Sequence, residues 1–172
     1  MKKTLIFFIL TTNIFLSFAQ SNWKNLSTDA YKIDYPDNWE VNQSGLMGTE
    51  FYLFTALSGS DDKFRENINL MIHDLQVDDI SLDDYIELTQ KQIKTLLTNS
   101  KLIESKRLKN NGVEFHMLVY TARQGMFDLK VMQYFWLIDG KEYILTYTAE
   151  VKEFDKFFPD VEKSMNSFKI LK

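Results

Sequence analysis

The chain has 172 residues, with 20 basic and 24 acidic side chains, a formal net charge of −4 and no cysteine. This length suits a single domain. A mildly acidic chain without a basic run is a poor candidate for binding nucleic acid or for electrostatic adhesion to anionic lipid. The lack of cysteine excludes disulfides, thiolate metal sites and an acylated lipoprotein anchor.

Residues 1–19 have the three parts of a secretory signal peptide. Two lysines are followed by a short apolar run over residues 5–16 and by small residues up to Ala19. The run carries polar residues at its centre and is shorter than the about 20 apolar residues that span a membrane. We therefore expect cleavage after Ala19, a single domain over residues 20–172 without a stable membrane anchor, and export to a bacterial periplasm or beyond the cell.

Strand patterns fill the next part of the chain. Tyr31 to Tyr35 alternates apolar and polar residues and ends at the turn cluster Pro36-Asp37-Asn38, with Trp39 as a core anchor beyond it. Glu50 to Leu57 is an aromatic-rich run. Asn67 to Gln76 alternates again, as expected for a strand whose two faces differ.

An amphipathic helix is predicted from Leu82 to Leu97, because apolar residues recur there at spacings of three and four. Ser81 is the expected N-cap, and Asp83 and Asp84 lie in the first turn, where carboxylates favour the positive end of a helix.

Strands then resume, separated by turn signals that contain glycine. The turns Asn110-Asn111-Gly112 and Asp139-Gly140 favour hairpins, since Asn, Asp and Gly tolerate positive φ. Hairpin-linked strands indicate a largely antiparallel sheet. The predicted strands are Leu102–Lys109, Val113–Val119, Leu129–Ile138 and Tyr143–Ala149.

The C-terminal segment is helical in pattern but contains a proline. Phe154, Phe158, Val161 and Met165 recur at helical spacing. Pro159 predicts a short helix, a break and a second helix that begins near the proline. The expected fold is one α+β domain with a central, mostly antiparallel sheet of about six strands flanked by helices.

The order of these motifs resembles the PsbP-like superfamily of PsbP and DcrB-type exported domains. The motifs that carry the resemblance span nearly the whole chain after residue 19. The resemblance implies an α-β-α sandwich that has no enzyme activity and acts by binding a partner, which differs from member to member. The matching segments are Tyr31–Trp39, Asn67–Leu75, Leu82–Ile93, Tyr143–Thr148 and Ser164–Phe168.

The histidines and the acidic clusters are the candidate metal ligands of this sequence. His73 and His116 would need adjacent strands to share an ion, and two independent strand histidines are the simpler interpretation. The acidic clusters Asp61-Asp62, Asp78-Asp79 and Asp83-Asp84 lack the spacing of a calcium loop, so helix capping and a solvated loop explain them better. No nucleophile motif or phosphate loop is present. We assign no catalytic, cofactor-binding or metal-binding residue.

The aromatic residues bear more directly on function, because a surplus beyond the core would form an exposed patch or groove. Ordinary core filling is the favoured interpretation. We expect a non-catalytic domain that binds an envelope or secreted protein; the alternative is a carrier of a small apolar ligand or lipid. The loops 58–66 and 122–128 are the places where function is expected. The aromatic residues in question are Trp23, Trp39, Phe51, Tyr52, Phe127 and Tyr147.

Overall fold

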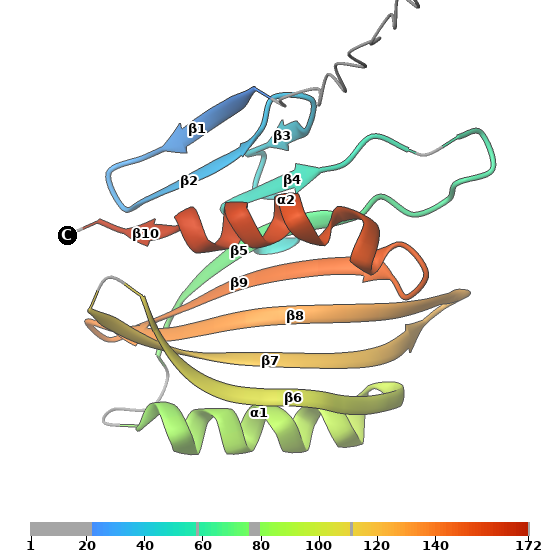
Figure 1. The fold of residues 1–172 in the computed structure, drawn as a ribbon. Helices are drawn as coiled ribbons and strands as arrows, with labels where there is room; N and C mark the ends of the chain where they lie inside the picture. The colour runs from blue at the N-terminus through green and yellow to red at the C-terminus, as the bar shows by residue number, and fades with distance from the viewer. Residues whose placement is uncertain (1–21, 58, 76–79, 111, 172) are drawn as a thin grey trace, which may run out of the picture.

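The computed structural model describes residues 22–57, 59–75, 80–110 and 112–171 (Figure 1). The signal-peptide prediction for residues 1–19 and the acidic pair Asp78-Asp79 lie outside the described residues. No helix within the described ranges is both long and apolar enough to cross a membrane.

Within the described residues, seven antiparallel strands form a large sheet in the order β3-β4-β5-β9-β8-β7-β6. The predicted antiparallel sheet is confirmed, with the short edge strand β3 in addition to the runs read from the pattern. Successive strands from β6 to β9 are hairpin neighbours, as the turn signals indicate. The strands are β3 (Glu40–Asn42), β4 (Phe51–Phe54), β5 (Asn67–Asp74), β6 (Thr98–Asn110), β7 (Val113–Gln124), β8 (Phe127–Ile138) and β9 (Lys141–Glu150).

A small sheet joins the two ends of the described chain. It has the order β1-β2-β10, with β1 at Trp23–Ser27, β2 at Tyr31–Pro36 and β10 at Lys169–Ile170. The alternation read in β2 is confirmed, since Tyr31, Ile33 and Tyr35 are all buried. These side chains pack in the core that β2 shares with α2. Strand β2 itself belongs to the small sheet and not to the large one.

Each face of the large sheet packs against one helix (Figure 1). Helix α1 (Leu82–Leu96) begins as predicted, with the Ser81 hydroxyl accepting a hydrogen bond from the Asp84 N–H at 3.1 Å. It packs Ile86 and Ile93 on β7 and β8. Helix α2 (Phe154–Ser167) lies on the opposite face, beside the small sheet. The predicted α-β-α sandwich is confirmed.

The predicted break at Pro159 is wrong, because α2 runs without interruption from Phe154 to Ser167. The proline removes one backbone donor and costs about 3 kcal/mol in a helix interior. Helix α2 buries Phe154, Val161 and Met165 on one side, and each such side chain contributes about 1.5–3 kcal/mol. Tertiary burial therefore outweighs the local penalty and keeps the helix continuous.

Replacing Pro159 by alanine is expected to raise the free energy of unfolding by about 2 kcal/mol, because alanine restores a helical N–H at an exposed position. Urea denaturation followed by circular dichroism measures the change. The neighbouring substitution Asp160→Ala is the control and should shift stability by less than about 0.5 kcal/mol. An unchanged midpoint for Pro159→Ala would contradict this account of the helix.

Candidate functional site

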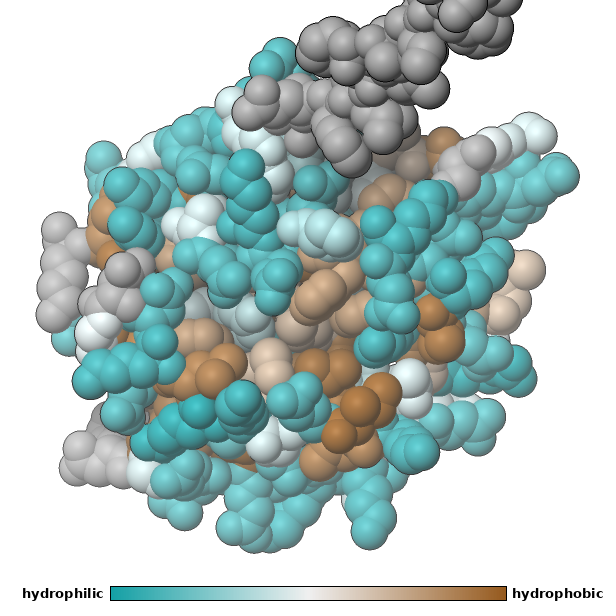
Figure 2. Space-filling view, viewed as in Figure 1, coloured by the Kyte–Doolittle hydropathy of each residue, from teal (hydrophilic) through white to brown (hydrophobic). Residues whose placement is uncertain are grey.

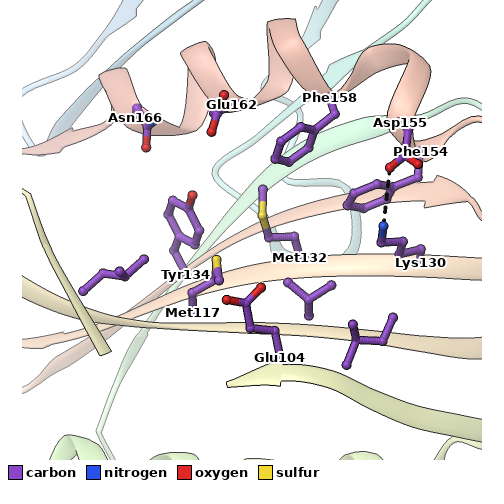
Figure 3. Close-up of a pocket in the computed structure, with 13 residues that line it drawn as sticks. Glu104, Met117, Lys130, Met132, Tyr134, Phe154, Asp155, Phe158, Glu162 and Asn166 are labelled. Carbon is purple, nitrogen blue, oxygen red and sulfur yellow. Dashed lines mark hydrogen bonds and ion pairs between the residues drawn. The ribbon is translucent and has the colours of Figure 1, made fainter. Parts of the chain in front are cut away.

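An open groove lies between α2 and the strands β6, β7 and β8, with a volume of about 430 Å³ (Figure 3). Its floor is apolar and consists of Met117, Val119 and Met132, while Phe154 and Phe158 project from α2. We call this cavity the α2 groove. In the space-filling view, hydrophobic residues gather over β6–β8 on the same side of the molecule (Figure 2).

Strand and helix periodicity together build the floor and wall of the α2 groove. Met117 and Val119 are two residues apart on β7, and Met132 lies directly opposite Val119 on β8. Side chains two apart on a strand share a face, so these residues point to the α2 side. Phe154 and Phe158 are four apart on α2 and therefore face the same way.

A bulge in β6 shapes the open side of the groove. The register between β6 and β7 shifts between Leu102 and Glu104, so Ile103 is an extra residue in the strand. Both Ile103 and Glu104 line the groove as a result. Ile103 remains 52% exposed, which leaves an aliphatic side chain at the mouth of the cavity.

The groove is acidic at one end. Glu104 from β6 and Glu162 from α2 line it beside Tyr134 (Figure 3). Burial, followed by the nearby carboxylates of Glu162 and Glu104, raises the pKa of Tyr134 to about 12. No hydrogen bond or ion pair holds either carboxylate among the described residues. Both remain available to a basic group of a ligand.

The other end of the groove carries a compensated charge. Lys130 Nζ lies 3.4 Å from an Asp155 carboxylate oxygen. The same ammonium lies 4.0 Å from the centroid of the Phe154 ring, which is a cation–π contact. The groove thus combines an apolar floor, one satisfied ion pair and two free carboxylates.

The structure does not bring the two histidines together. His73 is on β5 and His116 is on β7, and the strands β9 and β8 lie between them. His73 Nδ1 lies 2.9 Å from a Glu142 carboxylate oxygen. No group of three or more potential ligands that could hold a metal is found in the described part of the chain. The shared-ion hypothesis is therefore not supported by the geometry.

His116 has a structural environment beneath α1. Its Nε2 lies 2.8 Å from the Ser105 hydroxyl, which also accepts a hydrogen bond from the Gln90 amide at 2.8 Å. This chain of contacts ties α1 to β6 and β7. Burial lowers the pKa of His116, and the positive charge of Arg107 adds to the effect while Asp83 opposes it.

Three residues of the predicted acidic clusters, Asp62, Asp83 and Asp84, have local partners. Asp83 lies 2.6 Å from Arg107, and the Asp62 carboxylate accepts a hydrogen bond from the Phe64 N–H at 3.2 Å. The Asp84 N–H donates to the Ser81 hydroxyl at 3.1 Å, and an Asp84 carboxylate oxygen accepts from the same hydroxyl at 2.6 Å. The capping and loop interpretation agrees with these contacts.

The six aromatic residues divide into two groups. Trp39, Phe51 and Tyr147 are buried in the core. The other three are half-buried and covered by neighbours: Lys163 lies 3.8 Å from the Trp23 ring centroid, Tyr52 stacks on Phe54, and Phe127 packs against Phe64. Core filling accounts for Trp39, Phe51 and Tyr147, while Trp23 and Tyr52 lie outside both core clusters. None of the six lines the α2 groove.

A model of the PsbP-like protein family matches residues 14–170. The chain belongs to the PsbP-like family. No curated protein sequence matches it.

Solved structures show the same PsbP-like fold at low sequence identity. Cyanobacterial PsbP (CyanoP) from Synechocystis sp. PCC 6803 has a TM-score of 0.64 and 17% identity, covering 90% of this chain and 95% of its own. LpqN of Mycobacterium tuberculosis, involved in cell envelope biogenesis, has a TM-score of 0.62 and 12% identity, covering 91% and 88%. The Ran-binding protein Mog1p of Saccharomyces cerevisiae has a TM-score of 0.59 and 10% identity, covering 88% and 96%.

Sequence reasoning did not locate the α2 groove of this PsbP-like domain. It placed function in the loops 58–66 and 122–128, and no described residue of either loop lines the groove. Arg123 and Asp128, at the ends of the β7–β8 turn, are joined by two hydrogen bonds of 2.9 Å. No sequence motif marks the groove, because its lining comes from three strands and a helix and is spread over residues 103–166.

His116 predicts a pH dependence of stability. Its folded-state pKa is below the ordinary value of 6.5, so the unfolded chain takes up a proton first as the pH falls. The stabilisation is present above pH 6.5 and is lost as the pH falls through the lowered pKa. The free energy of unfolding, measured with urea between about pH 5 and pH 8, should depend less steeply on pH in His116→Gln than in the wild type. The control Gln92→Ala, at an exposed position of α1 without a titratable side chain, should retain the wild-type slope; equal slopes for all three proteins would contradict the assignment.

Proposed function

We propose that this PsbP-like domain is an exported, non-catalytic module that binds a segment of an envelope or secreted protein in the α2 groove. The observation that carries the proposal is the combination of an apolar floor with two uncompensated carboxylates, Glu104 and Glu162, at its rim. Such a groove favours a segment that presents apolar side chains and one basic group.

The alternative of lipid or apolar-ligand carriage is less favoured by the shape and lining of the cavity. A carrier needs an enclosed apolar pocket. The α2 groove is open, and its rim includes Asn166 as well as four charged side chains: Glu104, Lys130, Asp155 and Glu162. The two carboxylates that have no ion-pair partner among the described residues, Glu104 and Glu162, would have to be desolvated against an acyl chain without compensation.

A binding role without catalysis is inferred from the placement of polar groups. Ser105 and His116 contact each other, but the serine is also held by Gln90 beneath α1, on the opposite face from the α2 groove. Within the described residues, the groove offers no nucleophile next to a base. The description of Mog1p as Ran-binding supports a protein partner as the kind of ligand.

Export is inferred from residues 1–19, and an envelope setting is supported by the description of LpqN as involved in cell envelope biogenesis. A chain produced with its own leader in a bacterial host should be recovered from the envelope or medium with Gln20 as its first residue, as intact-mass measurement would show. Ala19→Arg should block this processing, because the cleavage site requires a small residue there. Recovery of an unprocessed wild-type chain from the cytoplasm would refute the export proposal.

The binding proposal is tested by affinity capture from the native envelope, followed by mass spectrometry. The double substitution Glu104→Lys, Glu162→Lys is expected to lose the partner recovered by the wild type, because it reverses the charge at the groove rim. The control Asp29→Lys, Asp61→Lys changes the net charge equally at exposed residues outside the groove and should retain it.

Recovery of the same partner by both double variants would refute the groove as the binding site. Recovery of a bound lipid and no protein would instead favour the carrier.

A further inference from the structure

Strand β6 is the outermost strand of the large sheet, next to β7 only. No described residue pairs with its outer edge. The strand is 13 residues long, and most of its side chains are exposed. The outer backbone N–H and C=O groups of such an edge are free to pair with another extended chain.

A second groove lies on the other side of this edge. It is formed between α1 and β6, with Ile93 of α1 and Leu102 of β6 among its lining residues, and it has a volume of about 430 Å³. We call this cavity the α1 groove. The α2 groove and the α1 groove therefore flank the same strand, one on each face of the sheet, and in Figure 1 β6 lies between α2 and α1.

Aliphatic side chains remain exposed where the two grooves meet β6. Leu102 is 40% exposed and lines the α1 groove, while Ile103 is 52% exposed and lines the α2 groove. Leu96 and Leu97, at the end of α1, are exposed beside the start of the strand. Aliphatic residues gathered on both faces of an open edge mark an interaction surface.

We propose that the partner binds as an extended segment added to the edge of β6, with alternate side chains entering the α2 groove and the α1 groove. This inference rests on the proposed function and specifies the binding mode. In strand addition, main-chain hydrogen bonds give affinity, and pockets for alternate side chains give specificity. Successive side chains of a strand point to opposite faces, which is where the two grooves lie.

The charges of β6 favour a segment of another protein over a second copy of this chain. Lys101, Lys106 and Lys109 make no ion pair within the described residues, and Glu104 is the acidic residue of the strand. Pairing β6 with itself would double this excess of positive charge, and like charges on paired strands are unfavourable. The complementary segment has apolar residues at two neighbouring positions, one for each groove, a basic residue facing Glu104 and acidic residues near Lys106 and Lys109.

The probe is a displayed library of random ten-residue peptides, selected on the purified protein. The enriched peptides are expected to have neighbouring apolar residues, one for each groove, and no helical spacing of three and four. Each enriched peptide is then synthesised in two forms, N-methylated on its odd or its even backbone amides. Because alternate amides point to opposite edges of a strand, one form should lose binding and the other should retain it.

Two substitutions test the two faces. Leu102→Lys and Ile103→Lys should each weaken peptide binding about tenfold, since each removes one aliphatic contact. Leu88→Lys is the matched control, an exposed leucine of α1 outside both grooves, and should bind as the wild type does. Hydrogen exchange should show protection of β6 amides by the peptide.

Several outcomes overturn the strand mode. These are no enriched peptide, enrichment of a helical period, equal effects of the two N-methylated forms, or weakening by Ile103→Lys alone. Protection of β6 that grows with protein concentration without peptide would assign the edge to a second copy. Capture of a native partner that depends on Glu104 and Glu162, without protection of β6, would leave the proposed function standing. Strand peptides bound by β6, without groove-dependent capture, would refute the proposed function alone.

Discussion

The fold depends on a sheet whose central strands are apolar on both faces. On β8, Met132, Tyr134 and Trp136 point to one side, while Val131 and Phe135 point to the other. Neither set can face water without losing most of the free energy that folds the domain, so each side needs a covering layer. Helix α1 supplies one layer, and α2 with the small sheet supplies the other.

The α2 groove follows from how that second layer is placed. Helix α2 packs mainly on β2 of the small sheet and on β9, the middle strand of the large sheet, rather than on β7 and β6. A helix of 14 residues covers only part of a sheet of seven strands. The apolar floor at Met117 and Val119 is left beside the helix, where Ile103 and Glu104 complete the groove. Strand β6, at the edge of the sheet, is also incompletely covered, so the apolar side chains Leu102 and Ile103 remain exposed on its two faces.

Local patterns predict local structure here, and long-range pairing decides the rest. The period of two in β2 and β7 and the cap at Ser81 were sufficient to place a strand face or a helix start. The continuity of α2 through Pro159 was not predictable, because it depends on burial against residues more than one hundred positions away. The separation of His73 from His116 depends on strand order, which alternation does not encode. The groove is a product of layer placement and has no motif of its own.

In the small sheet, β2 from the start of the described chain pairs with β10 from its end, so this sheet cannot be completed before β10 is present. Ile170 pairs with Tyr31, the Leu171 N–H donates to the Ala30 carbonyl at 2.8 Å, and the buried side of β2 packs on α2. Strand β2 therefore cannot complete its core until residues 169–171 have been synthesised. Contacts of such long sequence separation form slowly. A growing chain of this kind stays incompletely folded until residues 169–171 have emerged and paired with β2.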